Sequence, residues 1–223
     1  MTLNAMISPT YENSVFINCP FDATYRPLFE AVVFAVYDCG FFPRCALEIE
    51  DGSQVRIDKI NGIIRDCRLA VHDISSTQLD SVNRLPRFNM PFEFGIFVGA
   101  KAFGSEDHRR KACIVLDSER YRYQKFISDI AGQDIREHDR RPSVLIRQVR
   151  DFLSAYFPHA AMLPGGRTLA SRFQEFRRQL PTICGELCLD RRRLTFRDLS
   201  GLAVTWIRSN PLPHHAAVST PDA

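Results

Sequence analysis

The sequence predicts an α/β protein of flavodoxin-like type, with a doubly wound, mostly parallel sheet, helices on both faces and a C-terminal helical appendage. Short apolar runs alternate with longer segments whose apolar residues recur at the helical period. Such alternation is typical of parallel strands joined by right-handed helical crossovers. The runs predicted as strands are 14–18, 41–49, 69–71 and 112–116.

Each predicted helix has a start signal or a regular apolar stripe. Thr24, Ser53 and Ser143 are suitable N-cap residues for helices that follow them. Gly40 ends the first helix, and the second has one apolar stripe opposite a basic face. The stripe residues of these three helices are Leu28, Phe29, Val32, Val33 and Val36; Ile57, Ile60, Ile64 and Cys67; and Leu145, Val149, Phe152, Leu153 and Tyr156.

A further helix is predicted over residues 89–104. Pro91 belongs in a first helical turn, where a missing N–H costs nothing, so Glu93 falls in that turn or just after it. From Phe92 to Phe103 nearly every side chain is apolar or small, which predicts a helix buried on most sides.

The chain divides into residues 1–160 as the α/β domain, 161–210 as a helical extension and 211–223 as a disordered tail. Pro164 and two glycines mark the break before the extension. Its two apolar stripes follow a domain that already has enough helices, so we expect a homo-oligomer formed through them; folding back onto the first domain is the alternative. The stripes are Leu169, Phe173, Phe176 and Leu180, then Phe196, Leu199, Ala203 and Trp206.

Composition favours a soluble, cytoplasmic chain with no membrane segment. Of the 223 residues 45% are hydrophobic, no run of about 18 apolar residues occurs, and the N-terminus lacks the plan of a signal peptide. Seven cysteines in mostly apolar surroundings indicate reduced thiols, and we expect neither a metal, at Cys184 and Cys188 or elsewhere, nor an organic cofactor. Nucleic acid is not favoured at a net charge of +3, and the arginines of the C-terminal third are expected on a solvated face.

Two carboxylates follow the predicted strand at 69–71 and open the helix at 89–104. Asp73 and Glu93 would both lie at the carboxyl edge of the sheet, where open α/β folds bind ligands. Nucleophile elbows, phosphate loops, dinucleotide fingerprints and zinc-protease motifs are absent from the sequence. The alternative is structural, because Glu in a first turn complements the helix dipole and Asp after a strand can form a turn.

These motifs resemble the nucleoside 2-deoxyribosyltransferase family and the related TIR-like domains of bacterial defence systems. The residues are Cys19-Pro20-Phe21-Asp22, Asp73-Ile74-Ser75 and Phe92-Glu93-Phe94-Gly95. The resemblance covers about residues 14–118. It implies Glu93 as the nucleophile that takes the sugar and Asp73 as its partner in contact with sugar or base.

Further residues are candidates for substrate binding. A polar group around Asp129, Asp134 and His138 could border the same cleft, or be a surface loop. The insertion at 77–88 carries Arg84 and Arg87, which could bind a phosphate or be solvated. The candidate binding residues are Asn18, Pro20, Phe21, Asp22, Ser75, Arg87, Asn89, Asp134 and His138.

The sequence therefore predicts an enzyme that cleaves or transfers at the N-glycosidic bond of a nucleotide-like small molecule, NAD among them, with a possible place in stress or phage defence. An acid pair suits this chemistry because positive charge builds on the sugar. The alternative is a non-catalytic nucleotide sensor or assembly module, in which Glu93 only accepts a ribose hydrogen bond.

Overall fold

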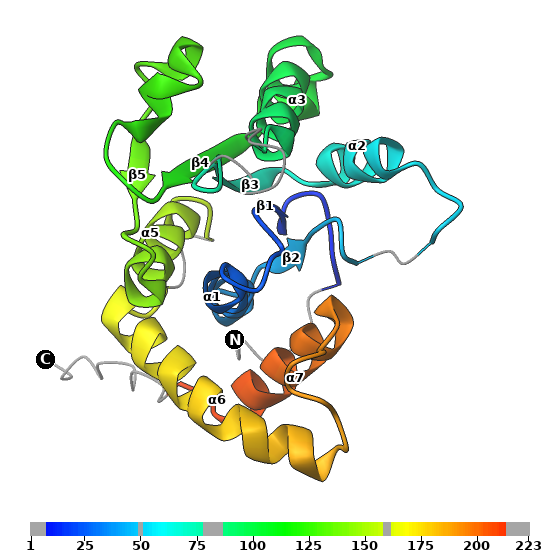
Figure 1. Cartoon of the computed structure of the whole chain (residues 1–223), viewed down its shortest axis with the longest axis vertical. Coiled ribbons are helices and arrows are strands. Elements are labelled where there is room, and N and C mark those ends of the chain that lie inside the picture. The colour runs from blue at the N-terminus through cyan, green and yellow to red at the C-terminus, as the bar shows by residue number, and fades with distance from the viewer. Residues whose placement is uncertain (1–7, 49–50, 78–86, 158–161, 213–223) are drawn as a thin grey trace, which may run out of the picture.

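Five parallel strands form the sheet of the computed structural model, in the order β2-β1-β3-β4-β5 (Figure 1). The structure describes residues 8–48, 51–77, 87–157 and 162–212. The predicted fold class, an α/β fold with a parallel sheet, is confirmed. The strands are β1 Ser14–Asn18, β2 Phe42–Arg44, β3 Leu69–Asp73, β4 Ala112–Asp117 and β5 Ile135–Glu137.

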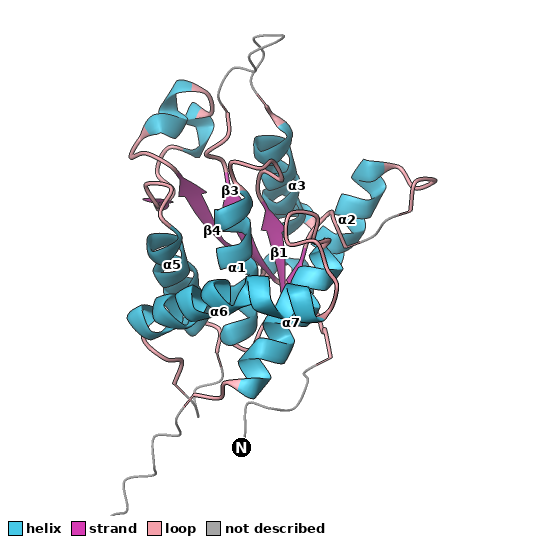
Figure 2. Ribbon diagram, turned by 60° about the horizontal axis from the view of Figure 1, so that its bottom comes forward, coloured by secondary structure: helices cyan, strands magenta, loops and turns pink. Residues whose placement is uncertain are grey.

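Helices cover both faces of this sheet. α2 and α3 lie on one face, α1 and α5 on the other, and α6 and α7 form an additional layer outside α1 and α5 (Figures 1 and 2). The α-helices are α1 Arg26–Asp38, α2 Arg56–Asp66, α3 Asn89–Phe103, α4 Glu106–Arg109, α5 Pro142–Ser154, α6 Gly166–Glu186 and α7 Phe196–Ser209; two 3₁₀ turns are η1 Arg122–Lys125 and η2 Ser128–Ile130.

Successive side chains of the central strands point to opposite faces of the sheet, and helices bury both faces. Val15 and Ile17 of β1 face the core under α1 and α5, while Phe16 joins the core under α2 and α3. β3 repeats this division, with Val71 on the first side and Ala70 on the second. Both faces of the central strands are thus apolar, as expected for a parallel sheet covered on both sides.

The additional layer changes the expectation for the C-terminal helices. Both predicted stripes are buried within the chain, as in the alternative of folding back, so the stripes themselves do not need a partner chain to cover them. Nor is every arginine there solvated: Arg172 binds the buried Asp38 of α1, and Arg191 binds the buried Glu30. These buried acids therefore find cationic partners in the extension, and Glu30 has a second partner, Arg26, on its own helix.

Several local predictions were wrong. None of the three expected hydroxyl caps operates: the side chains of Thr24 and Ser53 bind nearby aspartates, and Ser143 lies inside α5 after Pro142. The strand expected at 41–49 is limited to β2, and the polar strand β5 was not foreseen.

α3 is less enclosed than its composition suggested. It buries one face against the sheet, whereas Phe92 is 60% exposed and Phe103 is 91% exposed. The predicted disordered tail, apart from residues 211 and 212, and Arg84 of the predicted insertion lie outside the described residues.

Candidate functional site

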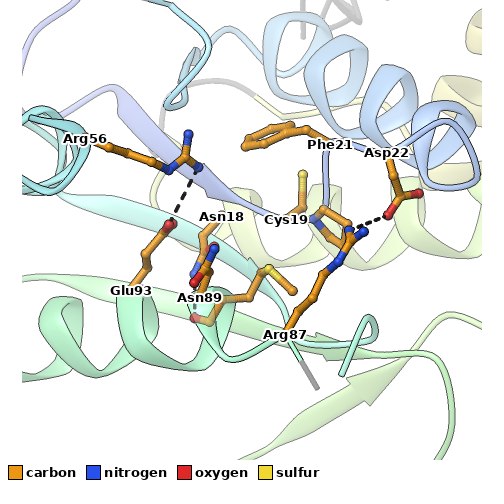
Figure 3. Close-up of a pocket in the computed structure, with 10 residues that line it drawn as sticks. Asn18, Cys19, Phe21, Asp22, Arg56, Arg87, Asn89 and Glu93 are labelled. Carbon is orange, nitrogen blue, oxygen red and sulfur yellow. Dashed lines mark hydrogen bonds and ion pairs between the residues drawn. The ribbon is translucent and has the colours of Figure 1, made fainter. Parts of the chain in front are cut away.

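A cavity of about 320 Å³ opens at the carboxyl end of β1 (Figure 3). Its place between β1 and β3 is where the strand order reverses, which is the usual ligand site of open α/β sheets. The volume is at the lower end of the range for small-molecule sites. The cavity is lined by Asn18, Cys19, Pro20, Phe21, Asp22, Arg56, Arg87, Asn89, Met90 and Glu93.

Glu93 is the central acid of this cavity. It is the fifth residue of α3, and only 8% of its side chain is exposed. Burial raises the pKa of Glu93 to about 7, although the guanidinium of Arg56, with Nη2 3.9 Å from Oε1, opposes the rise. A carboxyl with this pKa is partly ionised at neutral pH and can act as a nucleophile or exchange protons.

The loop after β1 is held by Asp22. One carboxylate oxygen accepts hydrogen bonds from the Thr24 hydroxyl at 2.6 Å and from the backbone N–H groups of Thr24 and Tyr25, and the other accepts from Arg87 Nη1 at 3.0 Å. Burial alone would raise the pKa of Asp22, but these hydrogen bonds and the charge of Arg87 outweigh it and hold the pKa below its ordinary value. Asp22 thereby holds the guanidinium of Arg87 at the cavity wall, with 52% of the Arg87 side chain exposed.

Asn18 offers an acceptor. Its amide nitrogen lies 2.8 Å from the Met90 carbonyl, to which it donates, and 3.0 Å from His72 Nδ1. Burial lowers the pKa of His72 to about 3, so this ring is neutral, accepts at Nδ1 and carries its proton on Nε2. Both amide hydrogens of Asn18 are therefore used within the chain, and its carbonyl oxygen is the atom it can present to a ligand.

Asp73, the second predicted acid, does not line the cavity. Its carboxylate is fully buried and accepts hydrogen bonds from the Tyr25 hydroxyl and from the Ser75 backbone N–H at 2.8 Å, and His138 Nε2 lies 2.9 Å away. Burial would raise the pKa of Asp73, but His138 and the hydrogen bonds outweigh it and lower the pKa below its ordinary value. Asp73 therefore connects the loop after β1 to the chain after β5.

The other predicted residues divide in the same way. Ser75 and His138 are buried around Asp73 and do not line the cavity, and Asp134 is on the surface, 82% exposed and paired with Arg136 at 3.3 Å. The predicted polar group of Asp129, Asp134 and His138 is therefore not a wall of this cavity. Six of the nine predicted binding residues do line the cavity together with Glu93, namely Asn18, Pro20, Phe21, Asp22, Arg87 and Asn89.

Sequence reasoning missed three lining residues. Arg56 belongs to the basic face predicted opposite the apolar stripe of its helix, yet it is the first residue of α2 and reaches Glu93 across the cavity. The usable signal was its position at a helix start near the carboxyl edge of the sheet. Cys19 and Met90 also line the cavity, and only their places beside the predicted binding residues Pro20 and Asn89 indicated this.

No family model, no curated protein and no solved structure matches this chain. The resemblance to deoxyribosyltransferases and TIR-like domains therefore rests on short motifs alone. Within the described residues, no helix is long and apolar enough to cross a membrane, and no cluster of side chains is suited to hold a metal ion.

Proposed function

We propose that the cavity binds a nucleotide-like small molecule and that the protein cleaves or transfers its N-glycosidic bond through Glu93. The observation that carries the proposal is a buried carboxylate with its pKa raised to about 7, set in a cavity at the switch point of a parallel sheet. Its surroundings supply an aromatic ring, amides and two guanidinium groups, which suit a base, a sugar and an anionic group.

The chemistry needs one attacking carboxylate. Glu93 forms a bond to the anomeric carbon while the bond from that carbon to the base nitrogen breaks, and the electron pair leaves with the base. Nicotinamide departs as a neutral molecule, whereas a purine must also gain a proton, which water in the cavity supplies. Water or an acceptor base then attacks the sugar ester and frees the carboxylate.

Arg56 and Arg87 give the site its charge preference. Arg87, held by Asp22, is available for a phosphate oxygen at the start of α3, where helix N–H groups also favour an anion. Arg56 lowers the pKa of Glu93 and so raises its ionised fraction. In this proposal Asp73 supports the loop after β1 and does not touch the sugar.

The test is the release of free base from purified protein incubated with NAD and with a panel of nucleosides and nucleotides, followed by mass spectrometry. Glu93→Gln should abolish release while the fold is kept, because the amide retains shape but cannot attack. Glu106→Gln, at an exposed carboxylate of α4, is the matched control and should release base at the wild-type rate. Undiminished release of free base by the Glu93→Gln variant would refute the role of Glu93 as the nucleophile.

A second candidate is a nucleotide-binding module without catalysis. The observation in its favour is that Asp73 is locked inside the protein, which leaves Glu93 without a second free acid in the cavity. Nucleotide binding that survives Glu93→Gln, with no base released by the wild type, would select this function. Homo-oligomerisation, a cytoplasmic location and a role in stress or phage defence stay predictions.

A further inference from the structure

Three aromatic rings connect the C-terminal helices to the cavity. Phe21 lines the cavity and packs edge to face against Phe29 of α1, with ring centroids 5.3 Å apart at 86°. Phe29 in turn contacts Phe196, the first residue of α7, at 6.1 Å and 41°. A displacement of Phe196 would therefore remove the support behind a residue of the cavity wall.

Polar contacts fix the same region. The loop between α6 and α7 accepts a hydrogen bond from Arg26 Nη2 at the Leu194 carbonyl, 3.1 Å away. Arg191 donates to both carboxylate oxygens of Glu30 at 2.9 and 2.8 Å, and Arg26 Nε reaches the same carboxylate at 2.9 Å. Glu30 is buried, so these bonds are stronger than surface pairs. The loop is thus tied to the first turns of α1, directly after the cavity loop.

The start of α7 is itself defined. Thr195 and Asp198 form a capping box, in which the Thr195 hydroxyl accepts from the Asp198 N–H at 3.1 Å and the Asp198 carboxylate accepts from the Thr195 N–H at 3.0 Å. Phe196 lies between these two residues and is buried. Its position therefore follows from a local motif and not only from packing.

The same helical layer also contacts the far end of α1, and there it does not touch the cavity. Phe34 packs on Phe176 of α6 at 5.2 Å, and Arg172 binds Asp38 near the end of the helix. Asp38 lies twelve residues after Arg26, which is about 18 Å along a helix. The layer thus offers an internal comparison: two contact zones on one helix, of which one reaches Phe21.

We infer that Phe196 and Arg191 are positioning residues of the cavity, which hold Phe21 and the loop after β1 in place for ligand binding. The helical extension is then part of the site and not an independent appendage. Only the consequence for substrate rests on the proposed function; the effect on the cavity wall is a property of the folded chain.

Cysteines already present can report this effect without a substrate. Cys19 lies on the cavity next to Phe21 and is buried; Cys39 caps the far end of α1 and is also buried; Cys188 is exposed. Alkylation by iodoacetamide, followed by mass spectrometry of peptides, measures local opening at each buried thiol. The exposed Cys188 serves as the reference for the activity of the reagent in each sample.

Phe196→Leu should increase the alkylation rate of Cys19 about tenfold and leave Cys39 within about twofold, because only the cavity end opens. Phe176→Leu is the matched control: it removes a ring from the same layer and should leave Cys19 within about twofold of wild type. Arg191→Gln should act like Phe196→Leu, and this second variant removes a charge contact and no ring.

Equal changes at Cys19 and Cys39 in the Phe196→Leu variant would show a general loss of stability and overturn the inference, as would an unchanged rate at Cys19. Failure to detect free base would leave these labelling results intact, so the two proposals fail separately. If base is released, Phe196→Leu should raise KM more than Phe176→Leu does, with kcat affected less.

Discussion

Replacing Glu93 by glutamine should stabilise the protein increasingly as the pH rises. A carboxyl with a pKa of about 7 in the folded chain and 4.5 in the unfolded chain binds more protons when folded between these values. The free energy of unfolding of the wild type therefore falls as the pH rises from about 4.5 to 7, and the full loss is present above pH 7. Burial of the ionised carboxylate causes this loss of stability, which is the cost of keeping an acid in the cavity.

The magnitude follows from the two pKa values. The loss amounts to about 1 kcal/mol at pH 5 and about 3 kcal/mol at pH 8. Glutamine cannot ionise, so it avoids this loss, in which the favourable charge of Arg56 is already included because Arg56 lowers the pKa of Glu93. The advantage of Glu93→Gln over the wild type should thus grow by about 2 kcal/mol from pH 5 to pH 8.

Urea unfolding of both proteins at pH 5, 6, 7 and 8 measures this difference, and the comparison cancels all groups that titrate alike in the two chains. Glu106→Gln removes an exposed carboxylate and serves as the control for loss of charge. A difference between Glu93→Gln and wild type that does not change with pH would refute the assignment of a buried, destabilised carboxylate.

Two other predictions concern charged contacts. If Glu93 attacks as the anion, kcat/KM for base release should rise with pH around a midpoint of about 7, and Arg56→Gln should move the midpoint upward, because the Arg56 charge now lowers the pKa of Glu93; a flat pH profile would contradict this. Arg172→Met should lower the free energy of unfolding by about 3–5 kcal/mol, because it leaves Asp38 buried without its partner, and adding Asp38→Leu should recover much of that loss in urea unfolding. If the variant with both substitutions is no more stable than Arg172→Met alone, the loss does not come from leaving Asp38 buried without a cation.

The fold was predictable because its signals are local. Apolar runs such as that of β1, alternating with helical stripes, indicate a parallel sheet without knowledge of any contact. β5 was not predicted because it is a short edge strand, and its residues Ile135, Arg136 and Glu137 lack an apolar pattern. The expected caps failed because the hydroxyls of Thr24 and Ser53 found aspartates two residues away, a competition that sequence spacing does not resolve.

The site was predictable only in part, for a related reason. Residues directly after β1 or at the start of α3 reach the sheet edge by chain connectivity, so Phe21, Asp22 and Glu93 could be expected together. The difference between Glu93 in the cavity and Asp73 beneath the surface depends on Tyr25 and His138, which come from separate parts of the chain. Partners so distant in sequence leave no periodic signal.

A chain that ends at Pro164 should fail to fold, although the sequence suggests a separate α/β domain before that point. Truncation removes α6 and α7, which cover the outer face of α1, and it would expose a helix whose residues from Leu28 to Val36 are all buried in the full chain.

The same truncation leaves the buried acids of α1 without their main partners. Glu30 would lose Arg191, and Asp38 would lose Arg172. Glu30 would keep only Arg26, and Asp38 would be left without a cation, at a cost of several kcal/mol. Each newly exposed large apolar side chain costs about 1.5–3 kcal/mol more, while a domain of this size is stable by only about 5–15 kcal/mol. Circular dichroism and size-exclusion chromatography of residues 1–164 beside the full chain test this, and a soluble, cooperatively folding fragment would show that the α/β part is independent of the layer that covers it.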